Sequence, residues 1–260
     1  MLIGAQRSLI RSSAVAAAAF TPASLFTTYG DGFWLVGSLG TCTDEAGTTP
    51  TTSDAAVILN WKDQSGFNRH FSRAAGGPIR KNSIINGEPV LRWTGNAAAT
   101  FGLIGATIAS WTSAEVFIVI DADQTGAGGY LDGGIWSLGT AASPDHYAYS
   151  DNNAYMGAFS TVRKSTGDPT PALDSPHLLN IYSASNDWNM LINGTSHFST
   201  ATNTFGAEAA PRIGQGRDGS GDIILSGDIA EVCAFPAKVT AGERTNMKSY
   251  LATKYNITVA

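Results

Sequence analysis

Charge is the first thing that this chain has little of. Asp, Glu, Lys and Arg together make up 14% of the 260 residues, whereas soluble domains usually contain about 25%. The net charge is −5 and the pI is near 5.3, and no cluster of Lys and Arg occurs. Nucleic-acid binding needs a basic face, because neutralisation of phosphates drives it. We therefore expect no nucleic-acid partner.

Cysteines and long apolar runs are also scarce. Cys42 and Cys233 lie far apart, outside any Cys-x-x-Cys or Cys/His pattern, which excludes the usual zinc sites. Two buried free thiols are the expected state, since pairing would require the fold to bring the chain ends together. No segment approaches the roughly 20 apolar residues of a membrane helix, so we expect no membrane insertion.

The first 24 residues allow two interpretations. Arg7 and Arg11 precede a short Ala/Val run in MLIGAQRSLIRSSAVAAAAFTPAS, as in a secretory signal peptide. The alternative is an extended or partly helical arm held by a partner, and we favour it. We assign residues 1–35 to this arm and residues 36–260 to a folded domain. The residues expected to attach the arm are Arg7, Arg11, Phe20, Leu25 and Phe26.

The residues that are abundant indicate a β protein. There are 29 glycines, and short β-branched or aromatic runs alternate with turn residues. These runs are AAVILNW (55–61), PVLRWTG (89–95), EVFIVID (115–121), HLLNIYS (177–183), WNMLING (188–194) and GDIAEVCAF (227–235). The run 115–121 predicts a central strand covered on both faces. In 188–194, Trp188, Met190 and Ile192 share one face, and Asn193-Gly194 predicts a hairpin turn.

One helix is predicted, over residues 240–255. Thr240 with Glu243 three residues later is a capping-box pattern. Apolar residues follow at helical spacing: Met247, Tyr250, Leu251 and Tyr255. No solenoid-like repeat or long linker occurs. The chain therefore predicts one β-sandwich with an N-terminal arm and a C-terminal helix.

Five segments, taken in order, resemble the laminin-G-like members of the concanavalin A-like lectin/glucanase superfamily. They are WKDQSGFNRHFS (61–72), INGEPVLRWTG (85–95), NMLINGT (189–195), PRIGQGRDGSGDIILSGDIAEVCAF (211–235) and ERTNMKSYLATKYNI (243–257). The resemblance extends from about residue 55 to residue 258. It implies an all-β fold, the concanavalin A-like jelly-roll β-sandwich.

Residues 20–66 carry a second resemblance, to the opening of proteins common in tailed bacteriophage genomes. Its motifs are TPASLF (21–26), DEAGTTP (44–50) and W-x-D-x-S-G (61–66), whereas FWLVGSLG (33–40) departs from the pattern. The resemblance implies a non-enzymatic virion protein at the particle surface, such as a capsid-decoration protein, head fibre or tail appendage. Its partners would be other virion proteins and copies of itself, with a trimer left open. The alternative location is extracellular, after secretion.

Hydrolysis is the first chemistry to weigh. Retaining glycanases of the resembled superfamily carry Glu-x-Asp-x-Glu on one strand, a pattern that this sequence lacks. Asp228 and Glu231 are three residues apart, so we expect them on opposite faces of a strand. We predict no enzymatic activity, and glycan hydrolysis through these two residues is the third-ranked function.

The segment 61–72 also places Asp63, Ser65 and His70 close together in sequence. Folds assemble catalytic triads from distant segments, and no Gly-x-Ser-x-Gly elbow is present. An Asp side chain that bonds the backbone two residues on, followed by a left-handed Gly66, predicts a turn instead.

Glycan binding is the alternative function: an adhesin that recognises host surface glycans. Sugar sites combine surface aromatic rings with a few polar groups, and HYAYSDNNAY (146–155) offers both. The candidates, expected to be exposed, are Tyr147, Tyr149, Asp151, Asn152, Asn153 and Tyr155. The same pattern fits a cross-strand aromatic ladder closed by an Asp-Asn-Asn turn.

Calcium is the last candidate. Laminin-G-like domains can hold one Ca²⁺ through oxygen ligands, which this ion prefers. Asp218 and Asp222 in GRDGSGD (216–222) are the best local candidates, although the sequence also fits a hairpin loop. We predict no cofactor.

Overall fold

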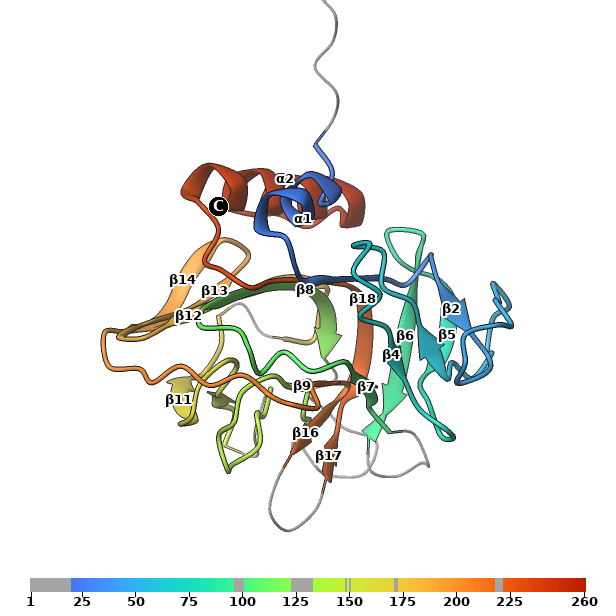
Figure 1. Ribbon diagram of the computed structural model, residues 1–260, viewed down its shortest axis with the longest axis horizontal. Coiled ribbons are helices and arrows are strands. Elements are labelled where there is room, and N and C mark those ends of the chain that lie inside the picture. Colours follow the sequence, from blue (N-terminus) through green and yellow to red (C-terminus); the bar gives the residue numbers. More distant parts are fainter. Residues whose placement is uncertain are drawn as a thin grey trace, which may run out of the picture.

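The computed structural model describes residues 20–95, 101–122, 133–147, 149, 151–170, 173–217 and 222–260. Figure 1 shows a β-sandwich with two helices on one side. The large sheet has the order β14 (Thr195–Thr200), β13 (Asp187–Ile192), β12 (His177–Ala184), β8 (Ala114–Ala122), β18 (Ser226–Phe235), β6 (Glu88–Thr94) and β5 (Ile79–Ile85). An eighth strand, β1 (Phe33–Val36), pairs with the C-terminal half of β18. All pairings are antiparallel.

The second sheet consists of short strands. Its order is β2 (Thr41–Cys42), β3 (Asn60–Trp61), β4 (Phe71–Ser72), β7 (Leu103–Gly105), β15 (Arg212–Ile213) and β9 (Trp136–Ser137). Two small pairs complete the strands: β10 (Ala154–Met156) with β11 (Lys164–Gly167), and β16 (Gln215–Arg217) with β17 (Asp222–Ile224). The helices are α1 (Ala23–Tyr29) and α2 (Ala241–Tyr255). This architecture confirms the predicted β-sandwich.

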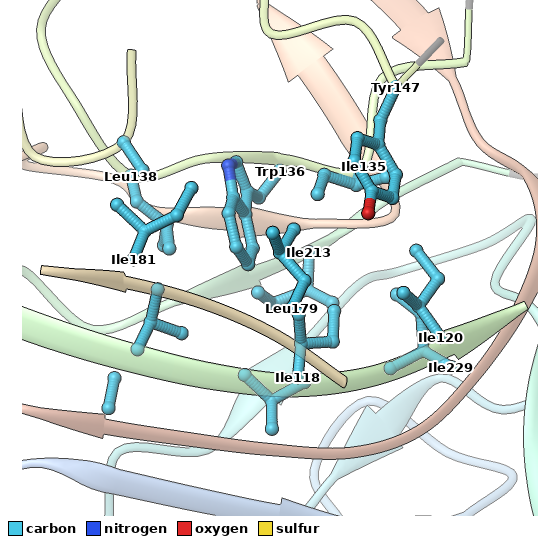
Figure 2. Packing of buried hydrophobic residues seen from close by; sticks show 14 of the residues in the cluster. Ile118, Ile120, Ile135, Trp136, Leu138, Tyr147, Leu179, Ile181, Ile213 and Ile229 are labelled. Atoms are coloured by element: carbon cyan, nitrogen blue, oxygen red, sulfur yellow. The ribbon is translucent and has the colours of Figure 1, made fainter. Parts of the chain in front are cut away.

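The main core fills the space between the two sheets. Ile118, Leu179 and Ile181 of the large sheet point toward Trp136 and Ile213 of the second sheet (Figure 2). All five are fully buried. Each alternate residue of a strand reaches this core because side chains in a strand alternate between its faces.

Several local predictions are confirmed. Strand β8 lies between β12 and β18, with Ile118 in the main core and Phe117 in a second apolar cluster on the outer face. Asn193 and Gly194 take φ values of 49° and 82° in the turn between β13 and β14, the left-handed conformation that tight hairpins need. Thr240 and Glu243 form the capping box of α2.

The helices cover the outer face of the large sheet. Apolar side chains of α2 form the second cluster together with residues of β8 and β18: Phe117, Val119, Cys233, Phe235, Met247, Leu251 and Tyr255. Neither described helix is both long and apolar enough to span a membrane. Cys42 and Cys233 are buried and unpaired, as expected.

Two buried glutamates of the large sheet hold α2 in place. Glu115 accepts hydrogen bonds from Nε and Nη2 of Arg244 at 2.6 and 2.7 Å. Glu231 accepts from Lys254 Nζ and the Tyr255 hydroxyl, each at 2.7 Å. Both carboxylates are 0% exposed, and buried charges persist only when they are paired and hydrogen-bonded.

The arm expected over residues 1–35 is wrong from residue 20 onward. Residues 23–29 form α1, β1 begins at Phe33, and a boundary at residue 35 would divide β1. Leu25 and Phe26 are 4% and 1% exposed, and the Phe26 ring stacks on Phe235 with centroids 4.7 Å apart. Phe20 packs against Tyr250. Since α1 has seven residues, it is too short to show helical periodicity. Arg7 and Arg11 lie outside the described residues.

The predicted placement of Asp228 and Glu231 is also wrong. A β-bulge at Ala230 shifts the register, so that Asp228 pairs with Asp121 and Glu231 with Val119 on β8. Asp121 and Val119 share a face of β8 because they are two residues apart. The extra residue of the bulge therefore brings both carboxylates to the outer face.

We expect that Phe26→Ala lowers the free energy of unfolding by about 3–5 kcal/mol, because it removes a buried aromatic ring. Urea denaturation measures the loss. Val162→Ala is the control: Val162 is 63% exposed, so its change should stay within about 0.5 kcal/mol. An unchanged midpoint for Phe26→Ala would show that α1 does not contribute to the core.

We expect that Glu231→Ala costs about 3–5 kcal/mol, because Lys254 then loses its buried partner. The matched control is Asp187→Ala, which breaks the exposed Lys238–Asp187 pair and should cost less than about 1 kcal/mol. Thermal or urea unfolding compares the two variants. Equal losses would contradict the anchoring role of Glu231.

Candidate functional site

The second sheet presents its outer face on the side opposite the helices (Figure 1). Strand pairing aligns one row of residues across it, since directly opposed residues share a face. The row is Asn60, Ser72, Ile104, Arg212 and Ser137. The adjacent positions Trp61, Phe71, Ile213 and Trp136 point into the main core. The sheet thus has an apolar inner face and a mostly polar outer face.

An open groove of about 670 Å³ lies on this face. Ser72 and Ile104 line it together with Glu45, Phe101 and residues 73–76. Phe101 is 36% exposed and Ile104 is 38% exposed. The groove therefore combines apolar surface with polar groups.

Arg73 and Phe101 form the most distinctive contact in the groove. The guanidinium carbon lies 4.1 Å from the centre of the Phe101 ring, a close cation–π arrangement. Arg73 Nε donates to the Ala75 carbonyl at 2.8 Å, and Nη1 donates to the Gly102 carbonyl at 3.2 Å. These bonds fix the guanidinium plane over the ring.

Residues 43–50 bring Glu45 to the groove. Asn60 Nδ2 donates to the Glu45 carbonyl at 2.7 Å, and the Asp44 carboxylate accepts from the backbone N–H groups of Thr48 and Thr49. The hydrogen bonds from Thr48 and Thr49 lower the pKa of Asp44 to about 2. The Asp44 carboxylate is therefore charged at neutral pH, and the hydrogen bonds that it accepts close the turn.

Sequence reasoning missed this groove. Its residues come from separate segments around positions 45, 73 and 101, and no single motif contains them. The strand register places Ser72 beside Ile104, and strands of two or three residues are too short to show a periodic pattern.

The predicted glycan segment forms a hairpin that contains the predicted aromatic ladder. The rings of Tyr149 and Tyr155 meet edge to face, 5.5 Å apart, and Arg163 lies 4.7 Å from the Tyr155 ring centre. Asp151 accepts from the Tyr155 hydroxyl at 2.7 Å and from Asn153 N at 2.9 Å, and the bond from Tyr155 lowers the pKa of Asp151. Asn152 takes the left-handed conformation of the turn.

Tyr147 is a correction to the predicted site. It is 2% exposed, and its hydroxyl bonds Nε2 of the buried His177 at 2.7 Å. Burial raises the pKa of Tyr147. Its ring belongs to the main core (Figure 2), so it is not available to a ligand on the surface.

Two buried titratable groups lie beneath the hairpin. Asp145 accepts from Gly157 N at 2.5 Å and from Trp136 Nε1 at 2.9 Å, which ties together the residues before and after the hairpin. Burial raises the pKa of Asp145 from 3.8 to about 7. Burial also lowers the pKa of His177 from 6.5 to about 4.

The cluster of Asp63, Ser65 and His70 is the predicted turn. Asp63 accepts from Ser65 N at 2.8 Å and from Ser65 Oγ at 2.6 Å, and Gly66 has φ of 94°. His70 Nδ1 accepts from the Asp63 backbone N–H at 3.0 Å. Asp63 also accepts from Trp34 N at 2.8 Å, so the motif joins the second sheet to β1.

The calcium candidates stay untested. Asp218 lies outside the described residues, as does the side chain of Asp222. Among the residues that the structure does describe, no group of three or more His, Cys, Asp or Glu side chains could hold a metal ion.

Two packed antiparallel sheets with a groove on one face form a β-sandwich. No protein-family model matches the chain, and no curated protein sequence does. Solved structures do resemble it. One is domain 4 of AbnA, a GH43 extracellular arabinanase from Geobacillus stearothermophilus, in complex with arabinotriose, with a TM-score of 0.53 and 15% identity over 75% of this chain and 100% of that one.

A botulinum neurotoxin type C structure, described with two ganglioside molecules in cell entry, has a TM-score of 0.51 and 13% identity. It matches 75% of this chain and 51% of its own. Trypanosoma rangeli sialidase in complex with sialic acid has a TM-score of 0.53 and 13% identity over 86% of this chain and 37% of its own. This chain thus spans about half of the toxin chain and less of the sialidase. The TM-scores show a shared fold, and at identities this low they show the fold alone.

Asp145 and His177 should make opposite contributions to the pH dependence of the free energy of unfolding. Between about pH 4 and 6.5 the unfolded chain binds a proton at His177 that the folded protein lacks, so this group makes stability rise with pH. Between about pH 4 and 7 the folded protein keeps a proton on Asp145 that the unfolded chain has lost, so stability falls with pH.

Single variants separate the two effects. Relative to the unmodified protein, Asp145→Asn should make the free energy of unfolding rise more steeply with pH in this window. His177→Gln should make it fall more steeply, and each change approaches about 1.4 kcal/mol per pH unit. Urea denaturation across the window measures both slopes. Slopes that shift in the same direction would contradict the assignment.

Proposed function

We propose that this protein is a non-enzymatic carbohydrate-binding domain whose groove on the second sheet holds the glycan. The stacked Arg73–Phe101 pair carries this proposal. A sugar ring has an apolar C–H face and a rim of hydroxyls, so it needs an apolar platform next to polar groups. Ile104 and the exposed part of the Phe101 ring, which is 36% exposed although Arg73 covers one of its faces, supply the platform. Ser72 and Glu45 supply hydrogen-bonding groups beside it.

The dimensions and position of the groove support this proposal. Its volume of about 670 Å³ falls within the roughly 300–1,000 Å³ common for ligand sites. Ser72 and Ile104 of the second sheet line it, and this sheet lies away from α1 and α2 (Figure 1), so an extended glycan can approach the groove without meeting a helix.

The comparisons suggest the class of ligand to test. The similar structures are described with arabinotriose, gangliosides and sialic acid. These ligands are bound by those proteins. At such low sequence identity, none of them can be assigned directly to this chain. They make neutral oligosaccharides and acidic, sialylated glycans the first two classes to examine.

Binding without hydrolysis is part of the proposal. Asp228 and Glu231 share a sheet face, but both are engaged. Asp228 forms a bidentate ion pair with Arg92, whose Nε and Nη2 donate to Oδ1 and Oδ2 at 2.7 and 2.6 Å. Glu231 is buried beneath α2. Neither carboxylate faces the groove, so we expect no release of reducing sugar.

The hairpin of residues 146–156 is the second candidate location. The half-buried rings of Tyr149 and Tyr155 lie beside Asp151 and Arg163. This arrangement is also explained by hairpin stability, because the Tyr155–Asp151 bond and the ring contact link the two arms. The groove is therefore the primary site in this proposal.

A glycan array probed with the full chain tests binding, and titration with the best ligand then compares variants. Phe101→Ala should weaken binding at least about fivefold, or about 1 kcal/mol, since it removes the stacking platform. Phe67→Ala is the matched control, because Phe67 is 38% exposed and does not line the groove. It should leave the affinity unchanged.

Two results would count against the groove. If Tyr155→Ala abolishes binding and Phe101→Ala does not, the hairpin is the site. If no glycan on the array binds, the carbohydrate-binding function itself is wrong.

The virion role is a separate and finer proposal that rests on the resemblance of residues 20–66 alone. The toxin, sialidase and arabinanase structures lend it no support. Leu25 and Phe26 pack inside the protein, so attachment would depend on residues 1–19. A test of attachment should therefore delete residues 1–19. A longer deletion, of residues 1–30, would also remove α1 and so disturb the folded domain. Partners in a particle, self-association and surface location stay predictions.

A further inference from the structure

A second pocket lies on the opposite side of the molecule, between α2 and the outer face of the large sheet. Its volume is about 220 Å³. Phe117 of β8, Leu178 of β12 and Leu191 of β13 supply apolar lining, and Arg244 and Lys248 of α2 line it as well. An apolar cavity of about 150 Å³ holds benzene, so this pocket accommodates roughly nine heavy atoms.

Asn180 brings an available acceptor to this pocket. The residue is 4% exposed and lines the pocket. Its Nδ2 donates to Glu115 Oε1 and to the Val116 carbonyl, both at 3.0 Å. No described protein group donates to its Oδ1, so this oxygen can accept a hydrogen bond from a ligand hydroxyl in the pocket.

Arg244 brings unused donors. Its Nε and Nη2 bind Glu115, and Nη2 also donates to the Val239 carbonyl. Nη1 finds no acceptor among the residues described. Lys248 donates one hydrogen bond, to the Ala260 carbonyl, and an ammonium group has three hydrogens to donate. Two cationic groups with spare donors therefore line a pocket whose other walls are mostly apolar.

These donors and the acceptor are neighbours. Asn180 Nδ2 and Arg244 Nε bond the same oxygen of Glu115, at 3.0 and 2.6 Å. A matching ligand would carry a hydroxyl on the carbon next to a carboxylate. The carboxylate would form ion pairs with Arg244 and Lys248. An alkyl chain would pack against Phe117, Leu178 and Leu191.

We propose that this pocket binds a small aliphatic 2-hydroxycarboxylate. The carboxylate binds Arg244 Nη1 and Lys248 Nζ, the hydroxyl donates to Asn180 Oδ1, and the alkyl group packs on the apolar lining. This site is separate from the groove on the second sheet, and it does not depend on the glycan-binding function.

The test uses the full chain and 2-hydroxy-4-methylpentanoate, a compound of nine heavy atoms, with binding followed by ligand-observed NMR and calorimetry. Two comparison compounds remove one group each: 4-methylpentanoate lacks the hydroxyl, and 4-methylpentane-1,2-diol lacks the charge. The hydroxy acid should bind at least about fivefold more tightly than the first compound, as expected for one additional hydrogen bond. The diol should bind more weakly still.

Variants locate the site. Lys248→Gln should weaken binding of the hydroxy acid at least about tenfold, and Leu191→Trp should block it by filling the pocket. Leu191 is half-buried, so the larger ring has room to extend, and an unchanged circular dichroism spectrum checks the fold. Phe101→Ala, in the glycan groove, should bind the hydroxy acid normally.

Three results would overturn the proposal. The first is no binding of the hydroxy acid to the unmodified protein at millimolar concentration. The second is equal affinity for the acid and the diol. The third is undiminished binding by both Lys248→Gln and Leu191→Trp.

Discussion

The hydrogen bonding of two buried glutamates determines how this molecule is arranged. Glu115 and Glu231 lie on the outer face of the large sheet with no exposed surface, and a buried carboxylate is tolerated only when donors surround it. Arg244, Lys254 and Tyr255 of α2 supply several of those donors. Asn180, Val239 and Trp34 supply others. The helix is therefore positioned by polar bonds as well as by its apolar contacts.

The position of α2 gives the molecule two faces that differ in access. Under the helix, the Arg244–Glu115 pair leaves part of the guanidinium and of Asn180 at a small pocket. On the other side the second sheet has no helix over it (Figure 1), and its groove is open. The proposed small anion and the proposed glycan are therefore assigned to different faces because only the groove has room for an extended ligand.

Local patterns predicted the elements whose stabilising contacts are local. The capping box of α2 needs only Thr240 and Glu243, and the Asp63 turn needs only its own next few residues. The continuous apolar run of β8 likewise indicated a strand covered on both faces. Helix α1 was missed because its stability comes from Phe235, more than 200 residues later in the chain. The exposure expected for Tyr147 was wrong because its partner is the distant His177.

The sequence by itself determined the class of fold, the central strand, the C-terminal helix and the turns, since each of these follows from residue periodicity or from bonds between near neighbours. Only the tertiary structure decided which surfaces can bind a ligand. Arg73 meets Phe101 and Arg244 meets Glu115 through strand pairing and helix packing, and the bulge at Ala230 decides which face Asp228 and Glu231 share. These contacts depend on three-dimensional register, which no local pattern in the chain encodes.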